Sequence, residues 1–297
     1  MCAGGAGVGA LAYLLATGSG QQLKTEAPSS TPEILPGTPI ALQPTGEVVD
    51  SGTTSVPGFP KKLVIEGEEY ALVGLGIRTV SFLSIQVYVV GFYVHADDLA
   101  ALQKALVQRI EKGASSLTSM EKQELRQRLL DPVEGEKLWE EVLENGRFRS
   151  AFRIVPTRNT DFQHLRDGWV RGIQQRSTKQ ASYDDERFAS ALGDFKALFG
   201  GAFKKSVPKQ KTLLLVRDKE GVFKAYYDPT GRNDGKLGGE GEEQKLQKLG
   251  EITEPRIAKA LWLCYLAGAK PASEPARKSI VEGVLEMASR PANTLAV

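Results

Sequence analysis

Residues 72–94 decide the fold of this chain, and they read LVGLGIRTVSFLSIQVYVVGFYV. The stretch is nearly continuous apolar sequence, rich in Val, Ile, Phe and Tyr, and Arg78 is its one charged residue. A helix of this length would be long enough to span a bilayer. The β-branched and aromatic content favours strands instead. We therefore expect one or two buried strands here, with a bend near residues 79–81.

Arg78 is the residue of this stretch that needs an explanation. A guanidinium stays charged in proteins, so in a buried strand it requires a carboxylate, a ring of acceptors or an anionic ligand. If a single strand ran from residue 78 to residue 88, its period of two would place Phe82, Ser84, Gln86 and Tyr88 on the face of Arg78. The residues alone leave both a structural ion pair and a ligand site open.

The composition excludes several classes of function. The chain has 38 basic and 36 acidic residues, a net charge of +2, and no basic stripe, so no nucleic-acid partner is expected. Cys2 and Cys264 are the only cysteines, which argues against a disulfide framework or a zinc site built from cysteines. His95 and His164 are the only histidines, and they lie far apart in sequence, so no metal centre is predicted.

The chain divides into three parts by composition. Residues 1–20 are small and apolar and are interpreted as a membrane-anchor segment, with a signal remnant or a misassigned start as alternatives. Residues 21–48 are rich in Pro, Ser and Thr and are predicted to form a flexible tether. Residues 49–290 carry the patterns of a folded domain.

Within this domain the patterns alternate between strands and helices. Strands are predicted at residues 62–65, 69–73 and 148–155, and a hairpin at 212–217 and 222–227. A helix that begins near Thr160 carries Phe162, Leu165 and Trp169 on one face. The glycine-rich residues 228–248 are interpreted as a mobile surface loop. The helix at 254–266 is predicted to be buried on most sides, with Cys264 as a core side chain.

Several of these stretches together resemble the chalcone isomerase fold. The resemblance covers residues 49–290 and rests on GLGIRTVSFLSIQVYVVGFYV (74–94), VPTRNTDFQHLRDGWVRGI (155–173), TLLLVRDKEGVFKAYYD (212–228) and ITEPRIAKALWLCYLAG (252–268). DSGTTSVPGFP (50–60) and LWLCYLAGAKP (261–271) are most similar to the fungal branch, the altered-inheritance-of-mitochondria proteins. The resemblance implies an α+β open-faced sandwich, in which helices cover one face of an antiparallel sheet and leave a cleft between the layers.

The resemblance also implies which residues would line that cleft. Arg78 matches the arginine that stabilises negative charge in the plant isomerases. The hydroxyl, amine and amide partners of that arginine become apolar here: they fall on Leu83, beside Ser84, and on Phe162, Leu165 and Trp169. Leu83 and Phe162 can neither donate a hydrogen bond to a ketone nor order a catalytic water. The sequence thus predicts a binding cleft rather than an isomerase.

Three hypotheses follow for its function. The first is a non-catalytic, membrane-anchored protein that binds an apolar acidic ligand, with haem favoured over a fatty acid. Its ligand-binding residues would be Arg78, Leu83, Ser84, Gln86, Tyr88, Phe162, Leu165 and Trp169, with His95 as the candidate haem ligand. The second is an intramolecular lyase of the chalcone isomerase type that uses Arg78 with Ser84, Gln86 or Tyr88. The third is a structural or interaction module with a vestigial cleft, in which Arg78 pairs with an internal carboxylate and no accessible pocket lies beside it.

The resemblance to the fungal branch implies a location as well. Those relatives suggest the mitochondrial inner membrane, reached through the N-terminal segment, with the domain in the intermembrane space.

Overall fold

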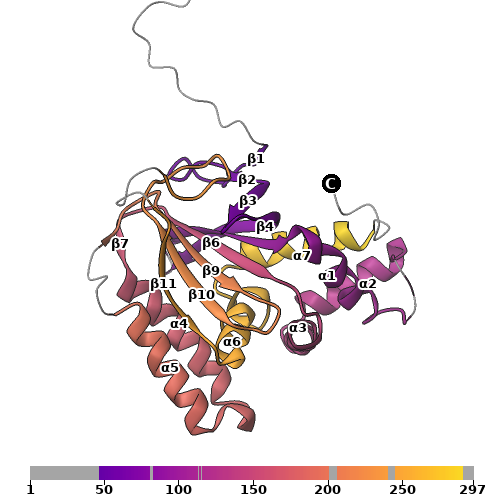
Figure 1. The fold of residues 1–297 in the computed structure, drawn as a ribbon. Coiled ribbons are helices and arrows are strands. Elements are labelled where there is room, and N and C mark those ends of the chain that lie inside the picture. The colour runs from indigo at the N-terminus through magenta and orange to yellow at the C-terminus, as the bar shows by residue number, and fades with distance from the viewer. Residues whose placement is uncertain are drawn as a thin grey trace, which may run out of the picture. The chain divides into compact units, whose positions relative to one another are not determined.

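The computed structural model describes residues 47–80, 83–112, 114, 116–200, 206–239 and 245–289. It is an α+β fold built on a curled antiparallel sheet with helices packed against one face (Figure 1). The predicted anchor at residues 1–20, and the tether up to residue 46, lie outside the described residues. Among the helices that are described, none is long and apolar enough to cross a bilayer.

The central sheet has seven strands in the order β11-β10-β9-β6-β5-β4-β3, and every neighbouring pair is antiparallel. Its strands are β3 (Lys62–Ile65), β4 (Glu68–Val80), β5 (Ile85–His95), β6 (Ser150–Pro156), β9 (Thr212–Arg217), β10 (Phe223–Asp228) and β11 (Gln247–Ile252). Two short pairs lie outside it: β1 (Val48–Val49) with β2 (Phe59–Pro60), and β7 (Thr160–Asp161) with β8 (Ser206–Val207).

Seven α-helices and two short 3₁₀ turns complete the described chain. The helices are α1 (Leu99–Val107), α2 (Ser119–Leu130), α3 (Glu134–Asn145), α4 (Phe162–Ser177), α5 (Glu186–Leu198), α6 (Pro255–Leu266) and α7 (Glu274–Ala288); the turns are η1 (Ala96–Asp98) and η2 (Ala181–Tyr183). Several helices begin where the sequence supplies a cap. Thr118 forms a capping box with Glu121 before α2, and Ser273 accepts a hydrogen bond from the backbone of Ala276 in the first turn of α7.

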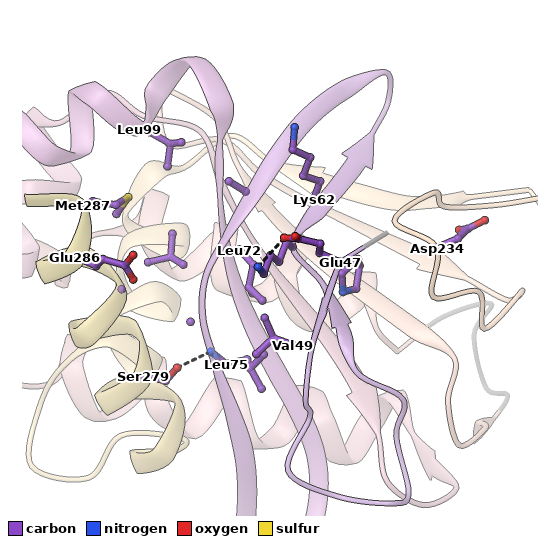
Figure 2. Close-up of a pocket in the computed structure, with 16 residues that line it drawn as sticks. Glu47, Val49, Lys62, Leu72, Leu75, Leu99, Asp234, Ser279, Glu286 and Met287 are labelled. Atoms are coloured by element: carbon purple, nitrogen blue, oxygen red, sulfur yellow. Dashed lines mark hydrogen bonds and ion pairs between the residues drawn. The ribbon is translucent and has the colours of Figure 1, made fainter. Parts of the chain in front are cut away.

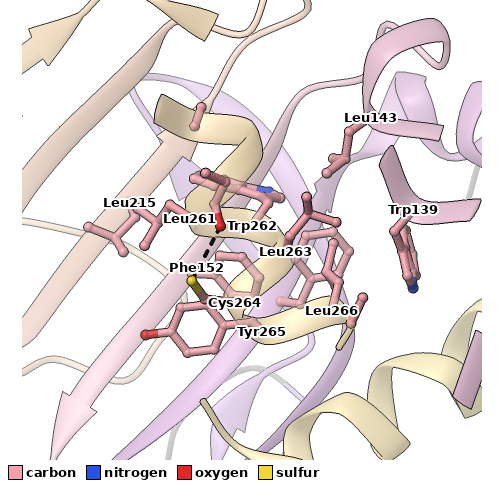
Figure 3. Close-up of a cluster of buried hydrophobic side chains, with 14 of the residues drawn as sticks. Trp139, Leu143, Phe152, Leu215, Leu261, Trp262, Leu263, Cys264, Tyr265 and Leu266 are labelled. Atoms are coloured by element: carbon pink, nitrogen blue, oxygen red, sulfur yellow. Dashed lines mark hydrogen bonds between the residues drawn. The ribbon is translucent and has the colours of Figure 1, made fainter. Parts of the chain in front are cut away.

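Helix α6 is the centre of the main core, between the sheet and the other helices (Figure 3). Every residue from Ala260 to Leu266 is buried, which confirms that this helix is apolar on nearly all sides. Trp262 donates a hydrogen bond to the Ser150 hydroxyl at 2.9 Å, so its one polar atom is satisfied within the core. Cys264 is buried as predicted, and burial raises the pKa of its thiol.

The opposite face of the sheet carries a second, smaller core that the sequence did not indicate. Phe59 packs there against Arg153, whose guanidinium lies 4.7 Å from the ring centroid. Arg153 donates to Asn233 at 2.9 Å, and Asn233 donates to the Gly58 carbonyl. Residues 229–239 form a loop, as the sequence predicted, but side chains bond it to the sheet and to the N-terminal segment. The predicted loop is too long at its end, because β11 begins at Gln247.

The decisive stretch, residues 72–94, forms two antiparallel strands rather than one. Strands β4 and β5 pair from Tyr70↔His95 to Val80↔Ile85, with a register shift at each end of the ladder. Near the turn, Arg78 pairs with Tyr88 but Thr79 pairs with Gln86, so Val87 is an extra residue in β5. Val87 and Tyr88 consequently both face the helical layer.

Helix α7 lies unusually close to β4 because glycines remove the side chains between them. Gly74, Gly76 and Arg78 follow one another on the face of β4 that the helices cover. A Cβ on Gly74 would come within 2.6 Å of the Ser279 carbonyl carbon, and one on Gly283 would overlap the Val73 carbonyl oxygen. The Ser273 hydroxyl donates to the Ile77 carbonyl at 2.7 Å, which fixes where α7 begins. Its N-terminal end is thereby placed beside Arg78.

This packing predicts that two Gly→Ala substitutions in helices change the free energy of unfolding in opposite directions. Gly283→Ala should lower the free energy of unfolding by about 2 kcal/mol or more, because the new methyl group forces α7 away from β4. Gly193→Ala, on the exposed face of α5 with nothing within 4 Å, should raise it by about 0.5–1 kcal/mol through helix propensity. Chemical denaturation of both variants measures the difference. Equal stabilisation by the two would show that the close approach is not maintained in solution.

Candidate functional site

Arg78 lies near the end of β4, half-buried, without an acidic partner among the described residues. One guanidinium nitrogen donates to the Ala272 carbonyl at 2.6 Å, just before α7. The guanidinium carbon lies 5.9 Å from the centroid of the Tyr88 ring on the adjacent strand. These two contacts leave several N–H donors unused. The positive end of the α7 dipole adds to the local positive potential, so the site favours a negatively charged group.

Behind Arg78, three side chains from three elements form a buried hydrogen-bond chain. Trp169 on α4 donates its indole N–H to the Tyr265 hydroxyl on α6 at 2.7 Å. The Tyr265 hydroxyl is also 2.7 Å from the Tyr88 hydroxyl on β5. All three side chains are at most 3% exposed. The chain therefore brings polar atoms to Arg78 through an otherwise apolar layer.

Burial dominates the ionisation of both tyrosines. It raises the pKa of Tyr88, although the nearby Arg78 charge opposes the shift. It raises the pKa of Tyr265 further, and the neighbouring Tyr88 acts in the same direction. Both hydroxyls consequently stay protonated at neutral pH and act as neutral donors.

Phe162, Leu165 and Trp169 lie on the buried face of α4, as the helical spacing predicted. The Phe162 ring stacks on Phe199 with centroids 6.4 Å apart and meets Tyr227 edge-on at 5.6 Å. The Trp169 ring contacts Phe199 at 5.3 Å. These side chains pack against one another in the main core and form an apolar, largely aromatic wall of packed side chains next to the tyrosine pair.

Three of the residues predicted to bind the ligand together with Arg78 are not brought to it. Leu83 and Ser84 are exposed in the β4–β5 turn, and Ser84 has a positive φ of 51°. Gln86 points to the other side of the sheet, where its side-chain oxygen accepts a hydrogen bond from Thr53 at 2.9 Å. The extra residue Val87 is the reason, because a one-residue bulge reverses the side-chain alternation. Phe82 lies outside the described residues.

The two histidines also lie away from Arg78. His95 is at the far end of β5, seven residues from Tyr88 and hence roughly 23 Å along the strand. There its Nδ1 accepts from the Asp97 backbone, and Nε2 lies 3.6 Å from Glu68. His164 is exposed in the first turn of α4 and contacts Asp161 at 2.6 Å. The structure therefore places no histidine beside Arg78.

A cavity of about 750 Å³ opens at a different place, along the edge of β4 (Figure 2). Leu72 and Leu75 are among its apolar lining residues. On the α7 side it is lined by Ser279, whose hydroxyl oxygen accepts a hydrogen bond from the Leu75 backbone N–H at 3.1 Å. Its rim carries both signs of charge, including an ion pair between Lys61 and Glu47 at 2.6 Å. Neither Arg78 nor Tyr88 belongs to its lining.

Sequence reasoning missed Tyr265 as part of the site. Residues 260–266 of α6 are apolar apart from the tyrosine hydroxyl, and a tyrosine in such a run is indistinguishable from a core aromatic residue. A buried tyrosine does need a hydrogen-bond partner, which is the one signal that could have pointed to it. The partner itself comes from the tertiary structure.

The fold agrees with the comparisons to known proteins. Residues 68–281 match the family described as chalcone isomerase like, and the chain belongs to that family. Among its relatives is altered inheritance of mitochondria protein 18, mitochondrial, of Debaryomyces hansenii, which is 32% identical over 78% of this chain and 73% of its own length. The protein of the same name from Eremothecium gossypii is 30% identical over 73% of this chain and 67% of its own.

A solved structure shares the fold. It is the Arabidopsis thaliana protein named fatty-acid binding protein, with a TM-score of 0.53 and 19% identity over 77% of this chain and 94% of that protein. The expected α+β sandwich of chalcone isomerase type is thus confirmed. At this identity the likeness concerns the fold alone.

The buried tyrosines make stability depend on pH on the alkaline side. An unfolded chain ionises tyrosine near pH 10, whereas the folded state holds Tyr88 protonated to higher pH. The contribution is fully present below about pH 10 and is lost as pH rises through the folded pKa, at up to about 1.4 kcal/mol per pH unit. Tyr88→Phe should therefore show a shallower loss of unfolding free energy above pH 10 than the unsubstituted protein.

Denaturant titrations between pH 8 and about 11 measure these slopes. Identical slopes for the two proteins, or tyrosinate absorbance from Tyr88 near pH 10 in the folded state, would contradict the burial of this hydroxyl.

Proposed function

We propose that this protein is a non-catalytic binding protein whose ligand is apolar and carries an acid group that Arg78 holds. The observation that carries the proposal is the half-buried Arg78, which has unused donors and no carboxylate partner in the described part of the chain. A half-buried guanidinium with free N–H donors is a favourable place for an anion, and an anionic ligand supplies one. The aromatic wall around Phe162 and Trp169 would contact the apolar body of the ligand.

A fatty acid is the simpler of the two candidate ligands. A single carboxylate requires one cation and neighbouring donors, which Arg78 and Tyr88 supply. The Arabidopsis protein that shares the fold is named a fatty-acid binding protein, which supports this ligand class.

Haem, which the sequence favoured, remains the second candidate. Its flat ring suits an aromatic wall, and a propionate would fit Arg78. Its iron needs an axial ligand, however, and His95 lies roughly 23 Å along β5 from the residue that neighbours Arg78. Among the described residues near Arg78, Tyr88 and Tyr265 carry the oxygen atoms that could serve instead. Because haem needs an axial ligand, we rank a fatty acid ahead of haem, the reverse of the order expected from the sequence.

The two alternative functions receive less support from the geometry. An isomerase would need polar partners around Arg78, but Ser84 is exposed in a turn and Gln86 faces the other side of the sheet. A vestigial structural cleft predicted Arg78 in an ion pair with an internal carboxylate and no accessible pocket beside it. The hydrogen bond of Arg78 goes to the Ala272 carbonyl instead of a carboxylate, but the described cavity along β4, which Arg78 does not line, agrees with the second part of that prediction.

We also propose a mitochondrial location, which the names of the fungal relatives support. Attachment to the inner membrane through residues 1–20, with the domain in the intermembrane space, is the finer part of this proposal. Fractionation and protease protection of mitochondria that express the full chain, compared with a chain lacking residues 1–20, test it. Release of the truncated chain from the membrane pellet is expected; equal retention of both would contradict an anchor in that segment.

Binding of laurate and of haem to the full chain and to Arg78→Ala tests the ligand proposal directly. Loss of a charge-assisted contact should weaken binding of the acid about 10- to 100-fold. Calorimetry for laurate and Soret absorbance for haem measure the affinities. Arg171→Ala, an exposed arginine on α4, is the matched control and should bind like the unsubstituted protein.

Each outcome discriminates between the ligands. Saturable binding of laurate but not haem would identify the fatty-acid class, and the reverse would restore haem. Binding of neither, or equal binding by Arg78→Ala, would reject Arg78 as the anchor of an acidic ligand.

A further inference from the structure

One end of the sheet exposes apolar side chains outside the core. Strand β4 ends at Val80, which is 40% exposed, and Leu83 in the turn to β5 is 67% exposed. A single exposed apolar residue is ordinary on a protein surface, so its neighbours decide whether it has a role. The pairing of the strands identifies those neighbours.

The loop after β6 brings an arginine to the same end of the sheet. Strand β6 ends at Pro156, and the Thr157 hydroxyl donates to the Gln86 carbonyl at the start of β5 at 2.9 Å. The Thr157 backbone N–H donates to the Val87 carbonyl at 3.0 Å. The next residue, Arg158, therefore lies beside the first residues of β5, and it is exposed.

The turn before β9 adds two lysines to this end. The Gln210 backbone N–H donates to the Pro156 carbonyl at 3.2 Å. The Lys209 backbone N–H donates to the Asn159 side-chain oxygen at 3.0 Å. Lys209 is exposed and Lys211 is half-buried. Because these hydrogen bonds join the two loops, the cations keep fixed positions next to the turn between β4 and β5.

The three cations have no ion-pair partner among the residues that the structure describes. The nearest carboxylate along the chain from Arg158 is that of Asp161, and it is already used. It accepts a hydrogen bond from the His164 backbone at 2.7 Å and contacts the His164 ring at 2.6 Å. Apolar side chains flanked by cations thus form one surface, the sheet-end surface, which consists of Val80, Leu83, Arg158, Lys209 and Lys211.

We propose that the sheet-end surface docks the domain on an anionic lipid bilayer. Leu83 would enter the boundary between headgroups and acyl chains, and the cations would contact acidic headgroups, which is the arrangement of residues that favours an interfacial position. An acidic protein would attract the same cations but would need a pocket shaped for Leu83, whereas a bilayer accepts any projecting apolar side chain. This inference goes beyond the proposed function and does not depend on the ligand.

The size of the surface predicts weak, reversible docking. Each cation near an anionic bilayer contributes roughly a fivefold gain in partitioning, and screening by salt reduces that gain. Binding should therefore require acidic lipid and fall as the salt concentration rises. The apolar contribution of Leu83 should be independent of both.

Sedimentation of the full chain with vesicles tests the proposal. One vesicle preparation is phosphatidylcholine alone, and the other is an equal mixture of phosphatidylcholine and phosphatidylglycerol. Residues 2–20 carry no charged side chain, so binding through that segment would not distinguish the two preparations. The difference in partitioning between them isolates the contribution of the cations.

A pair of substitutions removes two of the exposed charges. Arg158→Gln with Lys209→Gln should lower partitioning into the anionic vesicles about 10- to 30-fold and leave that into neutral vesicles unchanged. Lys104→Gln with Lys179→Gln is the matched control, because it removes two exposed charges on α1 and at the end of α4, away from the sheet-end surface. It should bind both preparations like the unsubstituted chain. Circular dichroism verifies that both variants are folded.

A second measurement reports on insertion of the turn itself. The native tryptophans Trp139, Trp169 and Trp262 are at most 3% exposed, so a bilayer does not reach them. Fluorescence of the Leu83→Trp variant should therefore be quenched by brominated phospholipids in anionic vesicles. Met120→Trp is the control: Met120 is 85% exposed at the start of α2 and should show no added quenching.

Each remaining outcome would overturn the inference. Equal partitioning of the unsubstituted chain into both preparations would show that the cations do not meet acidic lipid. Equal losses in the two charge pairs, or no quenching of the bound Leu83→Trp variant, would place the contact elsewhere on the protein. Absence of binding to either preparation would reject a bilayer and leave an acidic protein as the partner. Laurate affinity tests the proposed function separately, and the charge pair Arg158→Gln with Lys209→Gln should not change it.

Discussion

The register of β4 against β5 is the constraint on which the candidate site depends. The ladder sets Arg78 opposite Tyr88, and the extra residue Val87 turns Tyr88 toward the helical layer while Gln86 points away. A shift of one residue would exchange every side chain between the two faces. The guanidinium would then lie over the second core instead of beside the buried hydroxyls of Tyr88 and Tyr265.

The helical layer packs closely on β4 in this register because two residues of the strand have no side chain. Gly74 and Gly76 allow the backbone of α7 to rest directly on the strand, and Arg78 is the next residue on that face. The helix begins where Ser273 bonds Ile77, so its positive end adjoins the guanidinium. Close packing and the local positive potential thus have one structural origin. In the described chain, the Ala272 carbonyl just before α7 supplies an acceptor for Arg78 where no carboxylate does.

A second arginine shows that such a residue is not by itself a sign of a ligand. Arg153 is almost fully buried on the opposite face, but Asn233, the Arg232 carbonyl and the Phe59 ring surround it. Its donors are largely used to hold residues 228–239 against the sheet. Arg78 differs in that its contacts in the described chain, with the Ala272 carbonyl and the Tyr88 ring, leave N–H donors free. The contrast between the two arginines is the basis for treating only Arg78 as a binding residue.

The sequence by itself determined the elements and the class of fold. Apolar stretches of β-branched residues and amphipathic spacing in the helix at 162–177 are local signals, and they predicted the central strands, that helix and the burial of Cys264 correctly. It also singled out Arg78, because a charge within an apolar strand is visible without any structure. What only the tertiary structure decided is which side chains meet that charge. A bulge, a helix resting on glycines and a hydrogen bond between residues 88 and 265 depend on pairings across the chain, and periodicity within one segment carries no information about them.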